Sequence, residues 1–371
     1  MSFLLYYILP FAVVLGILIF FHELGHFLIA KSFGIKVLKF SLGFGPRLVW
    51  KKVGETEYSI RIIPLGGFVK MLGEDVQDEN APGLTPEDAE RAFNNQHVLK
   101  RMAVVSAGPI FNLALALVMF FGLYFVSGIQ VIPPEIGQIT DDSPAEKAGL
   151  MKGDTVIAIQ GEKVEEWADI KALVQNGAGK PLAVTIQRQG RLIEVTVVPE
   201  TATVKNEFGE DVKSALIGIV SSGKVKTLEL GPWQAVKKAT RDTWKWIHLT
   251  CLVIAKLFQG VVSLKTVGGP ILIGQMTGQL AQESFSYLIP FMAIISVNLG
   301  ILNLLPIPIL DGGLIIFLLM ELVLGKPLSI RTREYALKVG LFLLVLLMVV
   351  VTYNDLNRIK IFEKLIGKFF G

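Results

Sequence analysis

Four long apolar stretches dominate the pattern of hydrophobic and polar positions along the chain. They cover residues 3–27, 102–126, 287–305 and 336–353. A helix needs roughly 20 mostly apolar residues to cross the hydrocarbon core of a bilayer. The first stretch lacks the basic leading region and small-residue cleavage site of a signal peptide, so we expect it to remain. The pattern predicts a polytopic α-helical membrane protein with about four transmembrane helices.

Shorter patterns lie between the first two apolar stretches. Residues 48–72 alternate between apolar and polar positions, which predicts strands, and Pro64-Leu-Gly-Gly-Phe68 predicts a turn that breaks the run. Residues 74–96 are polar and acidic, which predicts a solvated loop or a short helix. We therefore expect a strand-rich loop after the first transmembrane helix.

Residues 129–222 show the pattern of a small soluble module. Alternating strands are predicted at 155–160 and 182–188, and a helix near 167–175. Glycines at turn positions separate these elements. The length of the segment suits an independent mixed α/β domain.

Residues 244–263 are apolar enough to suggest a fifth span, but charged and polar side chains interrupt them. Trp244, Lys245, Trp246 and Lys256 suit a helix at the bilayer surface. We predict that this segment lies in the outer interface or packs beside the bundle, without crossing the membrane alone.

The patterns divide the chain into seven segments with a predicted orientation. Basic residues follow the first helix and link the last two, so the positive-inside rule places the N-terminus outside and the first loop in the cytoplasm. The basic C-terminal tail departs from this rule, and we expect it to lie along the bilayer surface. The segments are transmembrane helix 1 (1–29), a cytoplasmic segment with a β-loop (30–100), transmembrane helix 2 (101–128), the outer α/β domain (129–222), an interfacial amphipathic region (223–283), transmembrane helix 3 with the proline-rich segment after it (284–325), and transmembrane helix 4 with an amphipathic tail (326–371).

Composition agrees with a membrane protein that carries a soluble domain. Hydrophobic residues make up 52% of the chain and charged residues only 18%, mostly in its middle. The net charge of +4 is modest, and no basic patch interleaves with aromatics, so we predict no nucleic-acid partner. Cys251 is the one cysteine, which excludes a disulfide within the chain.

The strongest chemical signal is His22-Glu-Leu-Gly-His26 within the first apolar stretch. On a helix, positions i and i+4 share one face, so both imidazoles can reach one zinc ion. Glu23 can then take a proton from the water that the metal activates. Ionisable groups are costly inside a membrane helix, which favours a functional role for all three.

A catalytic zinc needs a third protein ligand and an open position. The residues directly after His26 offer none. Asp311, in Asn303-Leu-Leu-Pro-Ile-Pro-Ile-Leu-Asp311-Gly-Gly, stands where prolines and glycines stop an apolar helix and let backbone line a cavity. We predict Asp311 as the third ligand, at the same depth as the histidines, with Glu321 as the alternative.

Three motifs in this order resemble the site-2 protease family of intramembrane metalloproteases, in its bacterial regulator-of-sigma-E protease branch. They are Phe21-His-Glu-Leu-Gly-His26, Gly108-Pro-Ile-Phe-Asn112 and Asn303…Asp311-Gly-Gly. The resemblance covers essentially the whole chain. It implies a location in the bacterial inner membrane.

The resemblance also implies roles for these residues. His22, His26 and Asp311 would bind Zn²⁺, and Glu23 would be the base. Asn303 and Asn112 would contact the substrate. Gly66 and Gly67 resemble the turn of the family's membrane-associated β-loop, to which an unwound substrate could add as a strand.

The 129–222 segment resembles a PDZ domain, on the residues Ser143-Pro-Ala-Glu-Lys-Ala-Gly-Leu and Gly153-Asp-Thr-Val-Ile-Ala-Ile. Ile217, Gly218 and Ile219 resemble its carboxylate-binding loop, whose groove could take an exposed C-terminus. The family uses such domains to admit substrates whose outer part has been trimmed. Many relatives carry two in tandem, whereas this sequence shows one.

We therefore predict a zinc-dependent endopeptidase that cleaves transmembrane segments of single-pass membrane proteins in the bilayer. A pre-trimmed anti-sigma factor or a remnant signal peptide would be typical substrates by resemblance. One alternative is a membrane-anchored metalloprotease that acts at the cytoplasmic face, with Glu321 as third ligand. Another is a non-catalytic PDZ adaptor, against which the presence of Glu23 argues.

Overall fold

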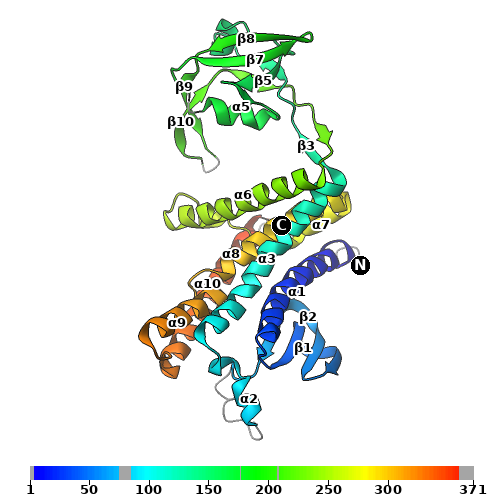
Figure 1. The fold of residues 1–371 in the computed structure, drawn as a ribbon, viewed down its shortest axis with the longest axis vertical. Helices are drawn as coiled ribbons and strands as arrows, with labels where there is room; N and C mark the ends of the chain where they lie inside the picture. Colours follow the sequence, from blue (N-terminus) through cyan, green and yellow to red (C-terminus); the bar gives the residue numbers. More distant parts are fainter. Residues whose placement is uncertain (1–3, 75–84, 176, 207–208, 359–371) are drawn as a thin grey trace, which may run out of the picture. The chain divides into compact units, whose positions relative to one another are not determined.

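The computed structural model describes residues 4–74, 85–175, 177–206 and 209–358 (Figure 1). The chain divides into two compact units. One unit consists of Met1–Leu123 and Val236–Gly371, and the other of Tyr124–Ala235. Each unit has its own arrangement of helices and strands.

Four helices in the described part of the chain are long and apolar enough to cross a membrane. They are α1 (Leu9–Ser32, preceded by η1, Leu4–Ile8), α3 (Val98–Ser127), α8 (Phe285–Asn303) and α10 (Ile330–Arg358). Local signals set their ends, because the Ser284 and Ser329 hydroxyls accept backbone N–H groups at the starts of α8 and α10. The predicted number of apolar helices is confirmed.

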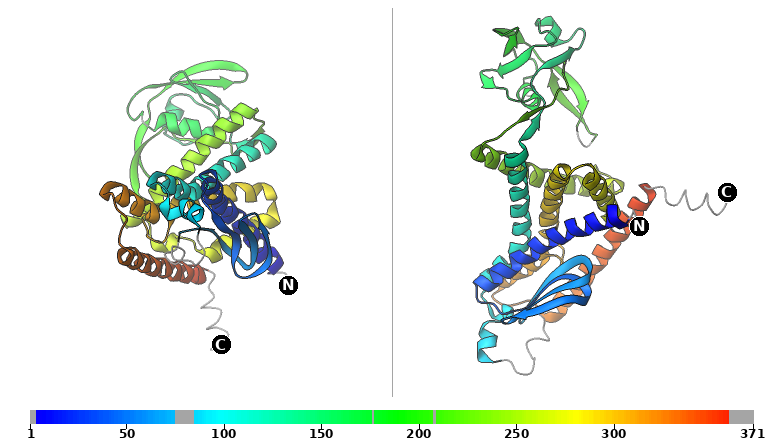
Figure 2. Two further views of the ribbon diagram at one scale, coloured as in Figure 1. Left: turned by 60° about the horizontal axis from the view of Figure 1, so that its bottom comes forward. Right: turned by 90° about the vertical axis from the view of Figure 1, so that its right-hand side faces the viewer.

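Helices α1, α3 and α8 pack closely in the first unit (Figures 1 and 2). Their shared core includes Leu18 of α1, Leu115 of α3 and Met292 of α8. Gly25 leaves no room for a side chain against the Ala107 carbonyl, so α1 and α3 approach to near backbone contact. Small residues at such crossings are typical of helices in lipid, where close van der Waals packing drives association.

A two-stranded sheet lies against the second half of α1 (Figures 1 and 2). Strands β1 (Val37–Val53) and β2 (Thr56–Met71) are joined by a tight turn in which Gly54 has a φ of 59°. Both strands bend, so Phe40 of β1 pairs with Tyr58 in one half of β2 and with Val69 in the other.

The pairing agrees with the turn predicted at Pro64–Phe68, although these residues lie within the bounds of β2. Residues 57–60 run along one side of 39–42 and residues 67–70 run along the other side in the opposite direction, so the chain reverses between Ile63 and Gly67. The chain bends at Gly66, which has a φ of 119°, and the pairing with β1 resumes at Gly67. Glycine and proline at such a position are typical of a change in chain direction. The predicted short helix is confirmed as α2 (Pro86–Glu90), followed by η3 (Phe93–Asn95); residues 75–84 of the predicted loop lie outside the described residues.

The second unit is a mixed α/β module, as its sequence pattern predicts. A four-stranded sheet has the order β6-β5-β7-β8, and its core includes Val156, Val184 and Ile186. Three further strand pairs are β11-β4, β10-β9 and β12-β3. The elements are β3 (Ile129–Val131), β4 (Ile136–Ile139), α4 (Pro144–Lys147), β5 (Thr155–Ile159), β6 (Glu162–Lys163), α5 (Trp167–Val174), β7 (Leu182–Arg188), β8 (Arg191–Val197), β9 (Glu200–Lys205), β10 (Asp211–Leu216), β11 (Ile219–Ser221) and β12 (Lys226–Leu228).

Two helices precede α8 in the chain, α6 (Pro232–Phe258) and α7 (Pro270–Glu283), with η4 (Leu264–Thr266) between them. Helix α6 covers most of the segment 244–263 and is not one of the four candidate spans among the described residues. Trp244 on α6 is exposed, which suits the predicted interfacial position. That position stays a prediction. The buried carboxylate of Asp355, on α10, accepts three backbone N–H groups at the start of α7 and fixes it there.

Candidate metal centre

Three potential metal ligands from two distant helices meet in the first unit. His22 and His26 lie one turn apart on α1, and their Nε2 atoms are 3.3 Å from each other. Asp311 Oδ2 lies 3.3 Å from His22 Nε2 and 3.7 Å from His26 Nε2. Within the described residues, this is the one group of three or more His, Cys, Asp or Glu side chains that could hold a metal ion.

Asp311 reaches this place because the chain breaks and restarts there. Helix α8 ends at Asn303, and α9 (Asp311–Leu324) begins at Asp311 itself. Gly312 and Gly313 pack so tightly against the backbone of 304–308 that neither has room for a side chain. The expectation that Asp311 ends an apolar helix is therefore wrong. It is the first residue of a new helix, whose N-terminal dipole stabilises a carboxylate.

The donor set fits a zinc ion. Two imidazole nitrogens and one carboxylate oxygen are the usual ligands of a catalytic zinc site, which keeps a fourth position open. Tetrahedral coordination at roughly 2.0–2.1 Å places ligand atoms about 3.3 Å apart, which is close to the separations observed here. Asp311 Oδ2 is also buried without a hydrogen-bond partner in the described part of the chain. A buried carboxylate oxygen in that state needs a cation or a donor.

The far side of each imidazole ring has a partner on α3. His26 Nδ1 lies 2.9 Å from the backbone oxygen of Val104, and His22 Nδ1 lies 3.2 Å from the amide nitrogen of Asn112. Gly108, one turn before Asn112, faces both rings, and a Cβ there would collide with His26 Nε2. Helix α3 therefore supports the two histidines from behind.

Glu23 lies on α1 beside the sheet. A Cβ at Gly67 would lie 3.0 Å from Glu23 Cγ, so this strand residue packs directly against the predicted base. The amide of Asn303 lies 3.5 Å from His22 Nε2. The metal ligands, the base, one predicted β-loop glycine and Asn303 thus gather in one place.

Other predicted residues lie elsewhere or have other contacts. Gly66 packs against the ring of Phe44, not against Glu23. Asn112 is fully buried on α3 against His22, which disfavours the substrate contact predicted for it. In the second unit, Ile217 is buried and Gly218 has a φ of 80°, and its carbonyl accepts from the Thr140 N–H. Ile219 begins β11, so these residues make a turn into a strand.

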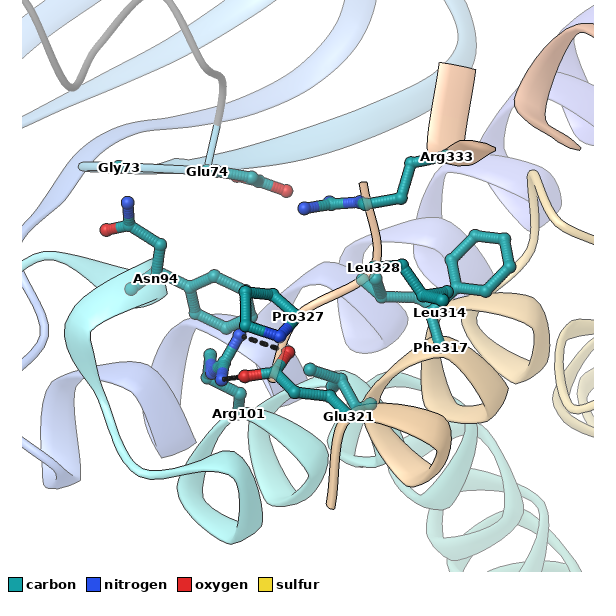
Figure 3. A pocket seen from close by; sticks show the side chains of 12 residues that line it. Gly73, Glu74, Asn94, Arg101, Leu314, Phe317, Glu321, Pro327, Leu328 and Arg333 are labelled. Atoms are coloured by element: carbon teal, nitrogen blue, oxygen red, sulfur yellow. Dashed lines mark hydrogen bonds and ion pairs between the residues drawn. The ribbon is translucent and has the colours of Figure 1, made fainter. Parts of the chain in front are cut away.

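Glu321, the alternative third ligand, is engaged by a different partner. Its carboxylate receives both terminal nitrogens of Arg101, at 2.5 and 3.3 Å, and both side chains are mostly buried (Figure 3). The pair lines a cavity of about 60 Å³ together with Glu74, Leu314 and Arg333 (Figure 3). A carboxylate neutralised by arginine is a poor metal ligand, so the structure favours Asp311 over Glu321.

An ion-pair network fixes the sheet at its turn. Glu55, in the turn between β1 and β2, accepts from Arg91 at 2.8 Å and from Lys31, at the end of α1, at 2.5 Å. The hydrogen bond from Arg91, and then the one from Lys31, lower the pKa of the Glu55 carboxyl, although burial opposes them. The network links the sheet to α1, the helix that carries the histidines.

Sequence reasoning missed two groups that shape this site. The backbone oxygen of Val104 holds His26, and a backbone group leaves no trace in residue identity. Arg101 neutralises Glu321, and their separation of more than 200 positions hides the pair from any local pattern. For this ion pair the sequence signal is weak, because Arg101 and Glu321 appear only as single charged residues beside or within apolar runs.

Comparison with known proteins agrees with this geometry. The profile of peptidase family M50 matches residues 10–347. A protein of Agrobacterium fabrum named as a zinc metalloprotease is 35% identical over 367 residues, which cover 96% of this chain and 97% of its own. One of Campylobacter jejuni, also named as a zinc metalloprotease, is 38% identical over 349 residues, with 93% and 92% covered.

A regulator of sigma-E protease from Salmonella typhimurium is 32% identical over 456 aligned positions, which cover 96% of this chain and 99% of the relative. A PDZ-domain structure from Listeria monocytogenes aligns at 15% identity with a TM-score of 0.20, over 25% of this chain and 90% of its own. So low a score carries no argument, and the PDZ assignment stays a prediction. These relatives and the four apolar helices indicate a protein of the inner membrane. The chain belongs to peptidase family M50 and is a zinc metalloprotease.

Proposed function

We propose that this protein is an intramembrane endopeptidase that cleaves the transmembrane segments of single-pass membrane proteins. His22, His26 and Asp311 bind the zinc ion, and Glu23 is the general base. The observation that carries the proposal is the meeting of these three ligand atoms within 4.8 Å of one another, with both histidines on a candidate membrane span and Asp311 at the start of the apolar helix α9. A site on such helices is suited to a substrate that is itself in the bilayer.

The chemistry divides between the metal and the chain. When bound, zinc polarises the scissile carbonyl and makes water nucleophilic at neutral pH. The carboxylate of Glu23 takes a proton from the attacking water and returns it to the leaving amide nitrogen. His22, His26 and Asp311 hold the metal, and Gly108 keeps the space in front of the two imidazoles clear. The side chains of His22 and Asp311 are mostly buried, with exposed fractions of 12% and 21%.

Cleavage requires an unwound substrate, because a helix keeps its peptide bonds in internal hydrogen bonds. Gly67 lies in the part of β2 that pairs with β1, and it packs against Glu23. A substrate segment added along this part of β2 would receive backbone hydrogen bonds and pass beside the base. The Asn303 amide, close to His22, would bind a freed backbone group of the same segment.

The predicted orientation belongs to this proposal. With residues 30–100 in the cytoplasm, the second unit would lie on the periplasmic side and act as a PDZ domain that binds a chain end exposed by earlier trimming. The alignment with the Salmonella relative spans 456 positions and this chain has 371 residues, so at least 85 positions have no counterpart here. That difference is large enough for one small domain, and fits the single PDZ module predicted for this chain.

The relative's name suggests the substrate class. The Salmonella relative is named a regulator of sigma-E protease. With the family resemblance, this name leads us to propose a pre-trimmed single-pass protein such as an anti-sigma factor, or a remnant signal peptide, as substrate here. The cytoplasmic-face alternative needed Glu321 as ligand, and Arg101 occupies that carboxylate. Membership of a peptidase family disfavours the adaptor alternative.

The test is a comparison of the purified wild-type protein with Glu23→Gln on a single-pass substrate in detergent or liposomes. We expect Glu23→Gln to keep one zinc per chain and to lose cleavage by roughly 10²–10⁴-fold, the usual contribution of a general base. Mass spectrometry of the products should place the cleaved bond within the substrate's apolar segment. Cleavage confined to residues outside that segment would refute the intramembrane assignment.

A second substrate pair tests unwinding directly. One substrate carries Asn or Gly in its apolar segment, which weakens the helix, and its matched control carries Leu at the same positions. The proposal predicts faster cleavage of the weakened helix. Equal rates for the two substrates would contradict the need for an unwound segment.

A further inference from the structure

The two histidines meet different groups on their outer sides. His26 Nδ1 faces the backbone oxygen of Val104, which can only accept a hydrogen bond. His22 Nδ1 faces the side-chain amide of Asn112, which can either donate or accept. The Nε2 atoms of both rings point into the Asp311 cluster. The distance between Asn112 and His22 therefore does not fix whether the amide donates or accepts the hydrogen bond.

The metal decides which role is compatible. A neutral imidazole carries one N–H, so an Nε2 that gives its lone pair to zinc leaves the proton on Nδ1. That proton needs an acceptor, which fixes the tautomer and the ring orientation. The Val104 oxygen meets this need for His26. A donor facing His22 Nδ1 would instead hold the proton on Nε2 and oppose metal binding.

Asn112 can meet the same need through its oxygen. Its side chain is fully buried, and Oδ1 has no hydrogen-bond partner within the described residues, while Nδ2 faces His22. The two ends of the amide exchange places by a rotation of the side chain that leaves its shape unchanged. Rotated in this way, Oδ1 accepts the His22 Nδ1 proton at the same separation.

We propose that Asn112 is a positioning residue that accepts the His22 Nδ1 proton through Oδ1 and so prepares Nε2 to bind zinc. The inference rests on the zinc site of the proposed function. It replaces the substrate contact predicted from resemblance, because a side chain with no exposed surface is out of reach of a substrate backbone. The Ser296 hydroxyl donates to the Asn112 backbone oxygen at 2.7 Å, which ties this part of α3 to α8.

The test is the zinc affinity of the full chain in detergent, measured by competition with a chromophoric chelator and without any substrate. Asn112→Leu keeps the size and removes the acceptor, and Asn112→Asp keeps the acceptor and removes the donor. His22→Ala is the reference for loss of a ligand. Asn298→Leu is the matched control, because Asn298 is an amide on α8 whose oxygen accepts from the Thr250 hydroxyl at 2.7 Å.

We expect Asn112→Leu to weaken zinc binding by about 10- to 100-fold, the usual effect of losing an outer partner of a metal-bound histidine. Asn112→Asp should bind zinc at least as tightly as the wild type, and Asn298→Leu should match the wild type. In ¹⁵N-histidine spectra of the zinc-loaded protein, His22 should carry its proton on Nδ1 in the wild type and in Asn112→Asp. A residue with only a packing role would not give this rescue by aspartate.

Two outcomes would overturn the inference. Wild-type zinc affinity in Asn112→Leu, with affinity lost in His22→Ala, would show that the amide does not prepare the ligand. Equal loss of zinc affinity in Asn112→Asp and Asn112→Leu would show that the amide acts as a donor. If the Leu variant does not fold, a loss of affinity in Asn112→Asp relative to the wild type overturns the inference by itself. Zinc affinity retained in His22→Ala would instead refute the zinc site of the proposed function.

Discussion

Helix α9 carries two carboxylates, Asp311 at its first residue and Glu321 near its end, and their surroundings differ in one respect. Both oxygens of Glu321 receive the guanidinium of Arg101. Asp311 Oδ2 faces two imidazoles and has no hydrogen-bond partner in the described part of the chain. A mostly buried carboxylate with its own cation contributes to structure, whereas one without a cation is available to a metal ion.

The largest expected effect separates these two carboxylates directly. Asp311→Asn should reduce cleavage by roughly 10³-fold or more, because zinc contributes several kcal/mol to the transition state. Glu321→Gln should keep its zinc, since it lies outside the cluster. Metal analysis of both purified variants checks this contrast. Zinc lost from Glu321→Gln and kept in Asp311→Asn would reverse the assignment.

The next effect concerns the stability of the Arg101–Glu321 pair. Removing one partner leaves a buried charge uncompensated, so Glu321→Leu or Arg101→Met alone should lower the free energy of unfolding by about 3–5 kcal/mol. The double variant Arg101→Met, Glu321→Leu should recover most of that loss, because both charges are gone. Chemical unfolding of the four proteins in detergent gives the double-mutant cycle. Additive losses would show that the two side chains do not act as a pair.

A smaller effect tests the space in front of the histidines. A Cβ at position 108 would meet both imidazoles, so Gly108→Ala should cost about 1–3 kcal/mol through overpacking and weaken zinc binding. Gly122→Ala, on the same helix, is the matched control because a Cβ there would have nothing within 4 Å. Thermal unfolding and chelator competition measure both consequences. Equal behaviour of the two alanine variants would mean that α3 does not confine the site.

The smallest effect concerns Glu55, a third carboxylate that is paired but partly exposed. Its folded-state pKa is lowered by Arg91 and Lys31, so its contribution is present above the ordinary carboxyl pKa and is lost as the pH falls through the folded value. The contribution should be at most about 1 kcal/mol, as for exposed pairs. The melting temperatures of the wild type and Glu55→Gln should differ at pH 7 and converge below pH of about 4. A difference that persists in acid would contradict this origin.

The sequence predicts those features that depend on local pattern. The long apolar runs are sufficient to predict the four helices. The rise per residue of a helix and the thickness of the bilayer set how many apolar residues a span needs. The spacing of His22 and His26 is sufficient to place both on one face of α1. The prolines and glycines around Asp311 interrupt an apolar run, and this pattern predicts Asp311 as a ligand.

The remaining features depend on contacts between distant segments. The position of Phe40 between the two halves of β2 depends on how both halves pair with β1. The start of a helix at Asp311 depends on Gly312 and Gly313 packing against the backbone before them. The burial of Asn112 against His22 depends on the crossing of α1 and α3. Such contacts follow from tertiary packing, which residue patterns along one segment do not contain.

The measurement that tests the central claim most directly is anomalous scattering at the zinc absorption edge from crystals of the full chain. The account predicts one anomalous peak bonded to His22 Nε2, His26 Nε2 and a carboxylate oxygen of Asp311, with Glu321 still paired to Arg101. A peak bound at Glu321, or no peak between the two imidazoles and Asp311 in zinc-loaded crystals, would contradict it.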